Sequence, residues 1–338
     1  MKSLDRLISP RSVAIIGAST DAGKLTGRPL AFLEKYGYAH EILPVNPRVS
    51  SIGRHPCFAD VKALPHAPDV AIVLVGSSRV VNIVRDLAAI GTGAAIVLAG
   101  GFGESGPEGV QRQQMLKEAA GTMRILGPNT IGLVNVTDGV VLSASAALGV
   151  NALLPGSTAL VSQSGGILGS LLSRTDALGI GFSKLIATGN EADVDVSDLM
   201  EYLIDDPATK VLALYLEGLR KPQQFRDAAL RAAKAGKPIV AFKVGRSSAG
   251  AQSAVSHTGA LAGSDAAYDA LFKQLGIIRA ERFSDLLDFP LVLGGGRHLA
   301  GRRLAVITST GAQPAWWRMP PVSRVSTCRL PSRQLPNA

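Results

Sequence analysis

Residues 12–20 read Ser-Val-Ala-Ile-Ile-Gly-Ala-Ser-Thr, a β-branched apolar run that ends in a turn of small residues. A strand followed at once by Gly-Ala-Ser is typical of a strand-to-helix connection, whose backbone N–H groups can face a phosphate. A tight connection without a ligand uses the same small residues, so this stretch alone leaves both interpretations open. It does predict the first strand of an α/β fold.

The same rhythm of apolar strands and helical stretches continues along the chain. In the first half the strand-like runs are 12–16, 41–45, 70–75, 94–98 and 124–126. The second series comprises 158–162, 182–186, 211–216 and 238–242. Alternation of strands with helices favours βαβ units and mostly parallel, doubly wound sheets, so the predicted fold class is α/β.

Turn signals at Asp138-Gly139 and Pro155-Gly156 bracket the predicted domain boundary. We expect a Rossmann-like domain over 1–137 and a flavodoxin-like domain over 150–296. A further strand-like run at 302–311 begins a third domain that the sequence does not complete.

The last segment, 312–338, differs from the rest of the chain because it holds both tryptophans and no acidic residue. Trp and Met each have a single codon, which fixes most bases beneath Trp316-Trp317-Arg318-Met319. Shifted by one base, with permitted codons at Ala315 and Arg318, they encode Met-Val-Ala-Asp-Ala, an ordinary helix start. We therefore expect a frameshifted, disordered tail.

Composition narrows the function classes. Of 338 residues, 46% are hydrophobic and 18% charged, which suffices for two cores. No apolar run approaches the ~20 residues of a membrane helix, and no secretory signal opens the sequence, so we predict a cytoplasmic protein without membrane partners. The 2 cysteines suit neither a disulfide framework nor a metal site. The net charge is +9, but the basic residues are scattered along the sequence, which argues against a nucleic-acid-binding protein.

Other strand ends in the first half are rich in glycine and small polar residues. They carry 75–78 (VGSS), 99–104 (AGGFGE) and 127–132 (GPNTIG). Ligands of open parallel sheets bind beyond the carboxyl ends of the strands, so these loops should line one crevice. A nicotinamide dinucleotide is disfavoured, because Ser19 replaces the second glycine of G-x-G-x-x-G and 44–47 (PVNP) lacks a ribose-binding acid.

Ser164, Gly165 and Gly166 follow a strand in the second half and open a helix expected to run to about residue 177. A helix N-terminus of this kind favours a bound phosphoryl group. Ordinary capping by Ser164 explains the same residues equally well without a ligand.

His257 lies between a Gly/Ser-rich loop and a helix expected to begin near Ser264-Asp265. A neutral imidazole can accept a phosphoryl group covalently, although a single loop histidine is more often merely exposed. Glu217, at the end of an apolar strand, is the carboxylate expected to orient this imidazole. A solvated strand-end residue is the alternative for Glu217.

Taken in order, the motifs match a known family. They are VAIIGAS (13–19), VNP (45–47), AGGFGESG (99–106), GPNTIG (127–132), SQSGG (162–166), GNEADVD (189–195), YLEG (215–218) and SHTGALAGSD (256–265). This combination resembles the ADP-forming acyl-CoA synthetases, relatives of the succinyl-CoA synthetase α subunit, over about residues 4–310.

The resemblance implies a role for each matching position. His257 matches the phosphorylated histidine, Glu217 its stabilising glutamate, and 164–166 the turn that receives phosphate or acyl phosphate. The CoA-binding positions implied by the resemblance are Gly17, Ala18, Ser19, Val45, Asn46, Pro47, Val75 and Asn129.

The implied reaction converts acyl-CoA, phosphate and ADP into a carboxylic acid, CoA and ATP, reversibly, through an acyl phosphate and phosphohistidine. In the family, ATP or ADP with Mg²⁺ binds an ATP-grasp domain or subunit, which this sequence lacks. We therefore expect an ATP-grasp partner or a truncated product, and allow for a homo-oligomer.

The same resemblance allows an alternative function. The chain would then be a CoA-binding regulatory module without catalysis, similar to the sensor region of a protein lysine acetyltransferase. The intact SHTGA motif favours catalysis. Acetate, branched acids and aryl acids all remain open as substrates.

Overall fold

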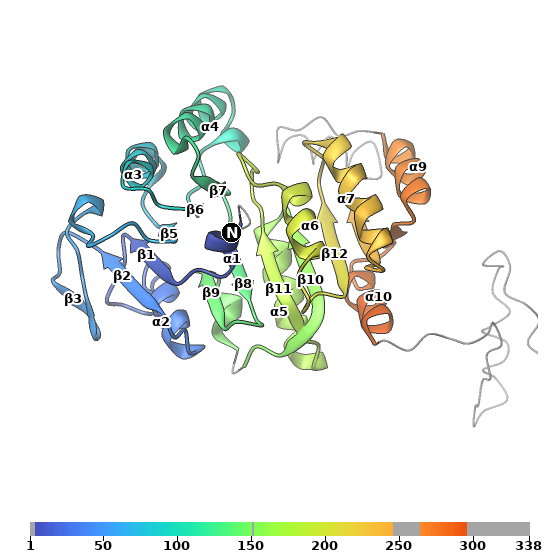
Figure 1. Ribbon diagram of the computed structural model, residues 1–338, viewed down its shortest axis with the longest axis horizontal. Coiled ribbons are helices and arrows are strands. Elements are labelled where there is room, and N and C mark those ends of the chain that lie inside the picture. The colour runs from blue at the N-terminus through green and yellow to red at the C-terminus, as the bar shows by residue number, and fades with distance from the viewer. Residues whose placement is uncertain (1–3, 151, 246–263, 296–338) are drawn as a thin grey trace, which may run out of the picture. The chain divides into compact units, whose positions relative to one another are not determined.

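The computed structural model describes residues 4–150, 152–245 and 264–295 (Figure 1). The described residues up to Gly294 belong to one compact unit. His257, the run 302–311 and the tail 312–338 lie outside the described residues.

The first sheet is parallel throughout, with the strand order β2-β1-β5-β6-β7. Its strands are β1 (Ser12–Ile16), β2 (Glu41–Val45), β5 (Val70–Val73), β6 (Ala94–Val97) and β7 (Arg124–Leu126). Each lies within the run predicted from the sequence. A short hairpin of β3 (Ser51–Ile52) and β4 (His55–Pro56) follows β2.

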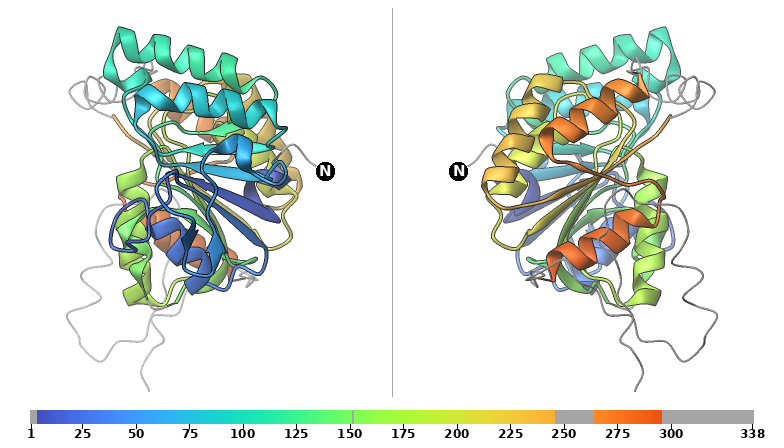
Figure 2. Two further views of the ribbon diagram at one scale, coloured as in Figure 1. Left: turned by 90° about the vertical axis from the view of Figure 1, so that its left-hand side faces the viewer. Right: turned by 90° about the vertical axis from the view of Figure 1, so that its right-hand side faces the viewer.

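Both faces of this sheet are covered, because successive strand residues point to opposite sides. Val13 and Ile15 share a core with apolar residues of α1 (Asp5–Ile8) and α2 (Arg28–Lys35). Ala14 and Ile16 face the other way, toward α3 (Ser77–Ala89) and α4 (Pro107–Ala120). Figure 2 shows α3 and α4 together on one side of the sheet and α2 on the other.

The second sheet has the order β14-β13-β12-β10-β11-β8-β9. Its parallel strands are β10 (Pro155–Ser162), β11 (Phe182–Ala187), β12 (Val211–Leu216), β13 (Ile239–Lys243) and β14 (Ile278–Arg279). The helices α5 (Gly165–Leu178) and α10 (Asp285–Gly294) contribute to the core on one face. The opposite face is covered by α6 (Val196–Ile204), α7 (Pro222–Lys234) and α9 (Asp265–Leu275).

An antiparallel hairpin that the sequence analysis does not predict completes this sheet. It consists of β8 (Gly132–Asn135) and β9 (Val140–Ser143), and β8 pairs antiparallel with β11. Asp138-Gly139 lies in the turn between the two strands. The hairpin therefore belongs to the second sheet although it precedes residue 150, while the domain boundary stays a prediction.

The parallel strands of both sheets follow one topology. In chain order, both β2-β1-β5-β6-β7 and β11-β10-β12-β13-β14 correspond to 2-1-3-4-5, the flavodoxin-like arrangement. The predicted doubly wound α/β class is confirmed. In this topology the order in which strands are added to the sheet reverses between β1 and β5 and between β10 and β12. A crevice forms at such a switch point, beyond the carboxyl ends of the strands.

No helix within the described ranges has both the length and the apolar character needed to cross a bilayer.

Candidate functional site

A cavity of about 570 Å³ opens beyond the carboxyl ends of strands from both sheets. From the first sheet it is lined by residues 74–75 after β5, 98–99 after β6 and 129–131 after β7. From the second it is lined by residues 163–166 after β10, 189–191 after β11, and 217–218 and Arg220 after β12. Its rim also includes Leu25, Arg28 and residues 144–146.

Six of the predicted site residues line this one cavity. They are Val75, Asn129, Ser164, Gly165, Gly166 and Glu217. Two come from the first half of the sequence and four from the second, so folding places the two sets of strand-end loops against one space. The expected crevice is thus present among the described residues.

The remaining predicted CoA positions do not line the cavity. Gly17, at the end of β1, has a φ of +86° and donates its N–H to the carbonyl of Val45 at 2.9 Å. Asn46 donates its side-chain N–H to the carbonyl of Ala18 at 2.7 Å. Ala18, Ser19, Val45, Asn46 and Pro47 therefore lie with Gly17 around the first turn. A Cβ on Gly17 would lie 3.3 Å from Cγ1 of Val75, which places this turn directly behind the cavity wall.

The candidate phosphate turn is held by Ser162, whose hydroxyl is buried beneath it. Oγ of Ser162 donates to the carbonyl of Ser164 at 2.7 Å and accepts the N–H of Ser164 at 3.2 Å. The helix α5 begins at the next residue, Gly165. Its first N–H groups have no partners within the helix, so they and the helix dipole provide an electropositive edge to the cavity.

Glycine at position 165 permits close packing against the loop after β7. A Cβ there would lie 2.8 Å from Cγ2 of Ile131, which belongs to that loop. A substitution would therefore require the Ile131 side chain or the phosphate turn to shift.

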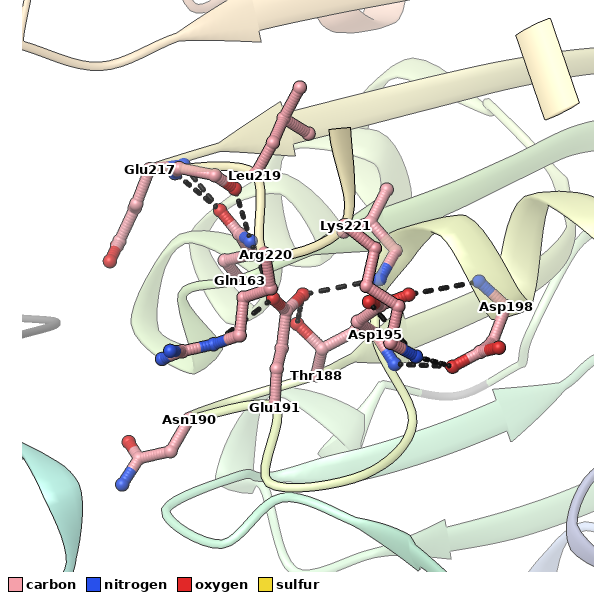
Figure 3. A network of polar contacts seen from close by, with 12 residues as sticks. Gln163, Thr188, Asn190, Glu191, Asp195, Asp198, Glu217, Leu219, Arg220 and Lys221 are labelled. Carbon is pink, nitrogen blue, oxygen red and sulfur yellow. Dashed lines mark hydrogen bonds and ion pairs between the residues drawn. The ribbon is translucent and has the colours of Figure 1, made fainter. Parts of the chain in front are cut away.

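Gln163 joins this turn to Glu217. Its side-chain oxygen accepts the backbone N–H groups of Glu217 and of Gly218, the latter at 3.0 Å. Its amide nitrogen donates to the carbonyl of Gly218 at 2.8 Å and to Oε2 of Glu191 at 2.9 Å. In Figure 3 the Gln163 amide lies against this backbone, and Glu217 and Arg220 extend away from it.

Glu191 is a buried carboxyl group at the same cavity, with 2% of its side chain exposed. Its Oε1 accepts the Thr188 hydroxyl at 3.0 Å and the N–H of Val196 at 3.2 Å. Nε of Arg220 lies 3.7 Å from its Oε2. Burial raises the pKa of Glu191 to about 7; the hydrogen bonds from Gln163 and Thr188 and the charge of Arg220 oppose the shift, whereas Asp195 adds to it.

Asn190 connects the two halves of the site. Its side-chain N–H donates to Glu104, in the loop after β6, and to Gln113 of α4 at 3.1 Å. Its side-chain oxygen accepts from Asn129 at 3.3 Å. The adjoining backbone also crosses between the sheets, because Asn190 N–H donates to the carbonyl of Pro128 at 2.9 Å.

Four of these residues, Gln163, Asn190, Glu191 and Arg220, were not among the predicted site residues. Two of them belong to the GNEADVD motif, which follows the apolar strand β11 and places three acids within seven residues. Acids that directly follow a buried strand are an available signal for a cavity-facing group. Gln163 has a weaker signal, because a neutral amide beside a Ser-Gly-Gly turn has no distinctive pattern.

Two family models match the chain in succession. A CoA binding domain matches residues 11–136, and a succinyl-CoA ligase like flavodoxin domain matches residues 155–293. A curated relative, the alpha subunit of ADP-forming acetate–CoA ligase I from Pyrococcus furiosus, is 37% identical over 315 residues. That match covers 91% of this chain and 67% of the relative.

The chain belongs to the ADP-forming acyl-CoA synthetase family. The resemblance predicted from the motifs is confirmed. Within this family, the ADP-forming acetate–CoA ligase of Methanocaldococcus jannaschii is 36% identical over 306 residues, which cover 89% of this chain but 42% of that protein. The chain thus spans about two thirds of the alpha subunit from Pyrococcus and under half of the longer relative.

A solved structure of the family has the same fold. The dinucleotide-forming acetyl-coenzyme A synthetase 1 of Candidatus Korarchaeum cryptofilum, in complex with phosphate and ADP, superimposes with a TM-score of 0.84 at 34% identity. The superposition covers 90% of this chain and 65% of that one. Both family regions are therefore present here in a fold already observed for a synthetase.

Proposed function

We propose that this chain is the CoA-ligase portion of an ADP-forming acyl-CoA synthetase, which converts acyl-CoA, phosphate and ADP reversibly into a carboxylic acid, CoA and ATP. The observation that carries the proposal is the shared cavity, in which Asn129 and Val75 of the first region face Ser164, Gly165 and Glu217 of the second. A thioester held by the first region and a phosphate held by the second would meet there.

The first step joins phosphate to the acyl group. A phosphate oxygen attacks the thioester carbon, the C–S bond breaks, and the CoA sulfur leaves as a thiolate that takes up a proton. The turn at Ser164 and Gly165 is suited to hold the phosphate through N–H groups at the start of α5. The products of this step are an acyl phosphate and CoA.

The second step moves the phosphoryl group to His257. A ring nitrogen attacks phosphorus, the P–O bond to the acyl group breaks, and the carboxylate leaves. In this proposal Glu217 fixes the tautomer and orientation of the imidazole. Transfer from phosphohistidine to ADP, with Mg²⁺, then takes place on an ATP-grasp domain or subunit, which is the proposed partner.

Three further predictions accompany this proposal. The regions 1–137 and 150–296 act as the CoA domain and the phosphohistidine domain, respectively. The first turn, with Gly17, Ala18, Ser19, Val45, Asn46 and Pro47, supports or contacts CoA together with Val75 and Asn129. The protein works in the cytoplasm, as a complex with the ATP-grasp partner or as a homo-oligomer.

The direct test is phosphoryl labelling of the full chain with acetyl [³²P]phosphate, with and without an added ATP-grasp subunit of the family. We expect an acid-labile, base-stable label that disappears in His257→Ala and persists in His66→Ala, an exposed histidine outside the cavity. Glu217→Gln should slow the labelling. A label that survives His257→Ala would contradict the assignment, and CoA binding without any label would favour a regulatory module.

A further inference from the structure

Gln163 uses every hydrogen-bonding position of its amide. The oxygen accepts two backbone N–H groups, from Glu217 and Gly218, and the nitrogen donates to the Gly218 carbonyl and to Glu191. An amide has two donor hydrogens and two acceptor lone pairs, so none is left over. Rotating the amide by 180° would set its N–H groups against two donors and its oxygen against two acceptors. One orientation is therefore strongly selected.

The Glu191 carboxyl group accepts one N–H of the Gln163 amide and so helps to fix the orientation of that amide. Val196 and Gln163 offer it N–H groups that can only donate, the Thr188 hydroxyl at 3.0 Å can donate to the ionised form, and Arg220 adds a positive charge at 3.7 Å. A carboxylate is an acceptor only, so it suits these neighbours. A proton on Oε2 would face the N–H of Gln163, and loss of the charge would weaken the remaining hydrogen bonds.

Glu191 itself is held in an unusual backbone conformation. Its φ is +55°, in the left-handed region that a glutamate seldom adopts. Backbone strain of this kind persists where surrounding contacts compensate for it, and it is common at functional sites. The strain points to a role that depends on this carboxyl position.

Gln163 also links the two candidate catalytic elements of the second region. It directly precedes Ser164 of the phosphate turn, and it binds the backbone at Glu217 across the ends of β10 and β12 (Figure 3). Movement of this amide would therefore displace the Glu217 backbone relative to the turn.

We propose that Gln163 and Glu191 are a positioning pair, in which the ionised Glu191 carboxylate holds the Gln163 amide and the amide holds Glu217 and Gly218 beside the phosphate turn. This inference deepens the proposed function and rests on it only for the effect on phosphoryl transfer. Neither residue touches the reacting atoms in this proposal; both act through the Glu217 backbone.

The charged groups around Glu191 determine how the pair responds to pH. Arg220 faces it from the loop after β12, and Asp195 faces it from the start of α6, where Lys221 lies 3.3 Å from Asp195 Oδ2. On the side of the first sheet, Glu104 contacts the adjacent Asn190. Because the pKa of Glu191 is raised to about 7, the pair should loosen as pH falls through neutrality.

The structural test records backbone amide resonances of Glu217 and Gly218 in the full chain between pH 5.5 and 8.5. We expect both to shift with a midpoint near pH 7, in the wild type and in a His257→Ala background that removes titration of that imidazole. Glu191→Gln should abolish this transition, while Glu118→Gln, on the exposed face of α4, should leave it unchanged. The same transition in Glu191→Gln, or none in the wild type, would overturn the proposal.

The kinetic test uses labelling by acetyl [³²P]phosphate. Glu191→Gln and Gln163→Ala should each slow it about 10- to 100-fold at pH 8, the effect of one charge-assisted hydrogen bond. The double variant should be no slower than Gln163→Ala, because Glu191 acts through Gln163; Gln223→Ala is the matched exposed control. Independent, multiplicative effects would contradict the pair.

The two tests separate failure of this inference from failure of the proposed function. A wild type that takes no label but shows the Glu191-dependent amide transition would retain the pair and refute the phosphoryl-transfer proposal. Normal labelling without that transition would retain the phosphoryl-transfer proposal and refute the positioning pair. Since Glu191→Gln keeps the shape of the side chain, it remains informative even if Gln163→Ala does not fold.

Discussion

Glu104 contacts the Asn190 side chain from the first sheet and Glu191 follows Asn190 in the second, yet their surroundings shift the pKa values of these two carboxyl groups in opposite directions. Glu104, in the loop after β6, is half-buried and accepts the N–H groups of Gly101 and Phe102 and the side chain of Asn190. Burial raises the pKa of Glu104, but these hydrogen bonds together outweigh burial and hold the pKa below its usual value. Glu191 has comparable hydrogen bonds but is fully buried, and its pKa rises.

The difference shows how one topology supports two kinds of site. In the first sheet, the loops beyond the strands are built mainly from backbone and small residues, and the carboxylate of Glu104 closes one such loop while it remains in contact with solvent. In the second sheet, side chains form a buried polar network around Gln163 and Glu191. Desolvation is the largest single influence on both pKa values, but at Glu104 the hydrogen bonds together outweigh it, whereas at Glu191 it prevails.

The largest effect is expected at Gly189, where the loop after β11 packs against the backbone of Pro128 and Asn129 in the loop after β7. We call this contact between the two regions the seam. This residue has a φ of +62°, and a Cβ there would lie 2.4 Å from the Pro128 carbonyl oxygen and 2.6 Å from that of Asn129. Gly189→Ala should lower the free energy of unfolding by about 3 to 4 kcal/mol, through backbone strain and a clash with a second backbone. Urea denaturation measures the change.

Gly236→Ala is the matched control, because Gly236 has a φ of +67° and nothing within 4 Å of the added Cβ. It should cost only about 1 kcal/mol, from backbone conformation alone. Equal losses for the two variants would show that the seam contributes no packing constraint of its own.

The next effect concerns the stability contributed by Glu191. Its folded pKa of about 7 exceeds the unfolded value of 4.5, so between these values the folded state binds more protons and stability falls as pH rises. Above pH 7 the ionised group lowers the free energy of unfolding by up to about 3 kcal/mol. Glu191→Gln should therefore match the wild type near pH 4.5 and exceed its stability at pH 8.

Denaturation curves at several pH values test this expectation, alongside the labelling assay. A variant more stable than the wild type at pH 8 yet slower in phosphoryl transfer would show that the buried charge is retained for positioning at a cost in stability. A stability difference that does not change with pH would contradict the assignment of the titrating group.

The sequence predicts the strands well, because each is a short apolar run bounded by turn residues, as with 12–16 and 211–216. It does not predict the β8–β9 hairpin, whose turn at Asp138-Gly139 resembles a linker until the partner strand β11 is known. It also places Ser164 and Glu217 at the carboxyl ends of strands, where the structure finds them lining the cavity, while their roles stay predictions. The role of Gln163 depends on four contacts to residues 28 to 55 positions away, and no local pattern encodes them.

A smaller effect is expected in the first region at Asn46. Its side chain donates to the Ala18 carbonyl at 2.7 Å and accepts the N–H of Arg48 at 2.9 Å, which holds the turn after β1. Asn46→Ala should lower the free energy of unfolding by about 1 to 2 kcal/mol and weaken CoA binding measured by calorimetry. Asn82→Ala, at an exposed side chain of α3, is the control and should change neither. Unchanged CoA affinity would separate this turn from the CoA site.

The smallest effect is expected at Glu104. The direction in which its stability contribution changes with pH tests whether the pKa values of Glu104 and Glu191 are shifted in opposite directions. Because the folded pKa of Glu104 lies below 4.5, the group stabilises the fold above that pH, and this contribution is lost as pH falls through the folded pKa. Glu104→Gln should therefore cost about 1 kcal/mol at pH 7, limited by partial solvent exposure, and this cost should shrink as pH falls below 4.5 toward the folded pKa. Its stability difference from the wild type thus changes with pH in the opposite direction from that of Glu191→Gln. If both differences changed in the same direction, hydrogen bonding to the loop backbone would not outweigh burial at Glu104, and the two carboxyl groups would not differ in kind.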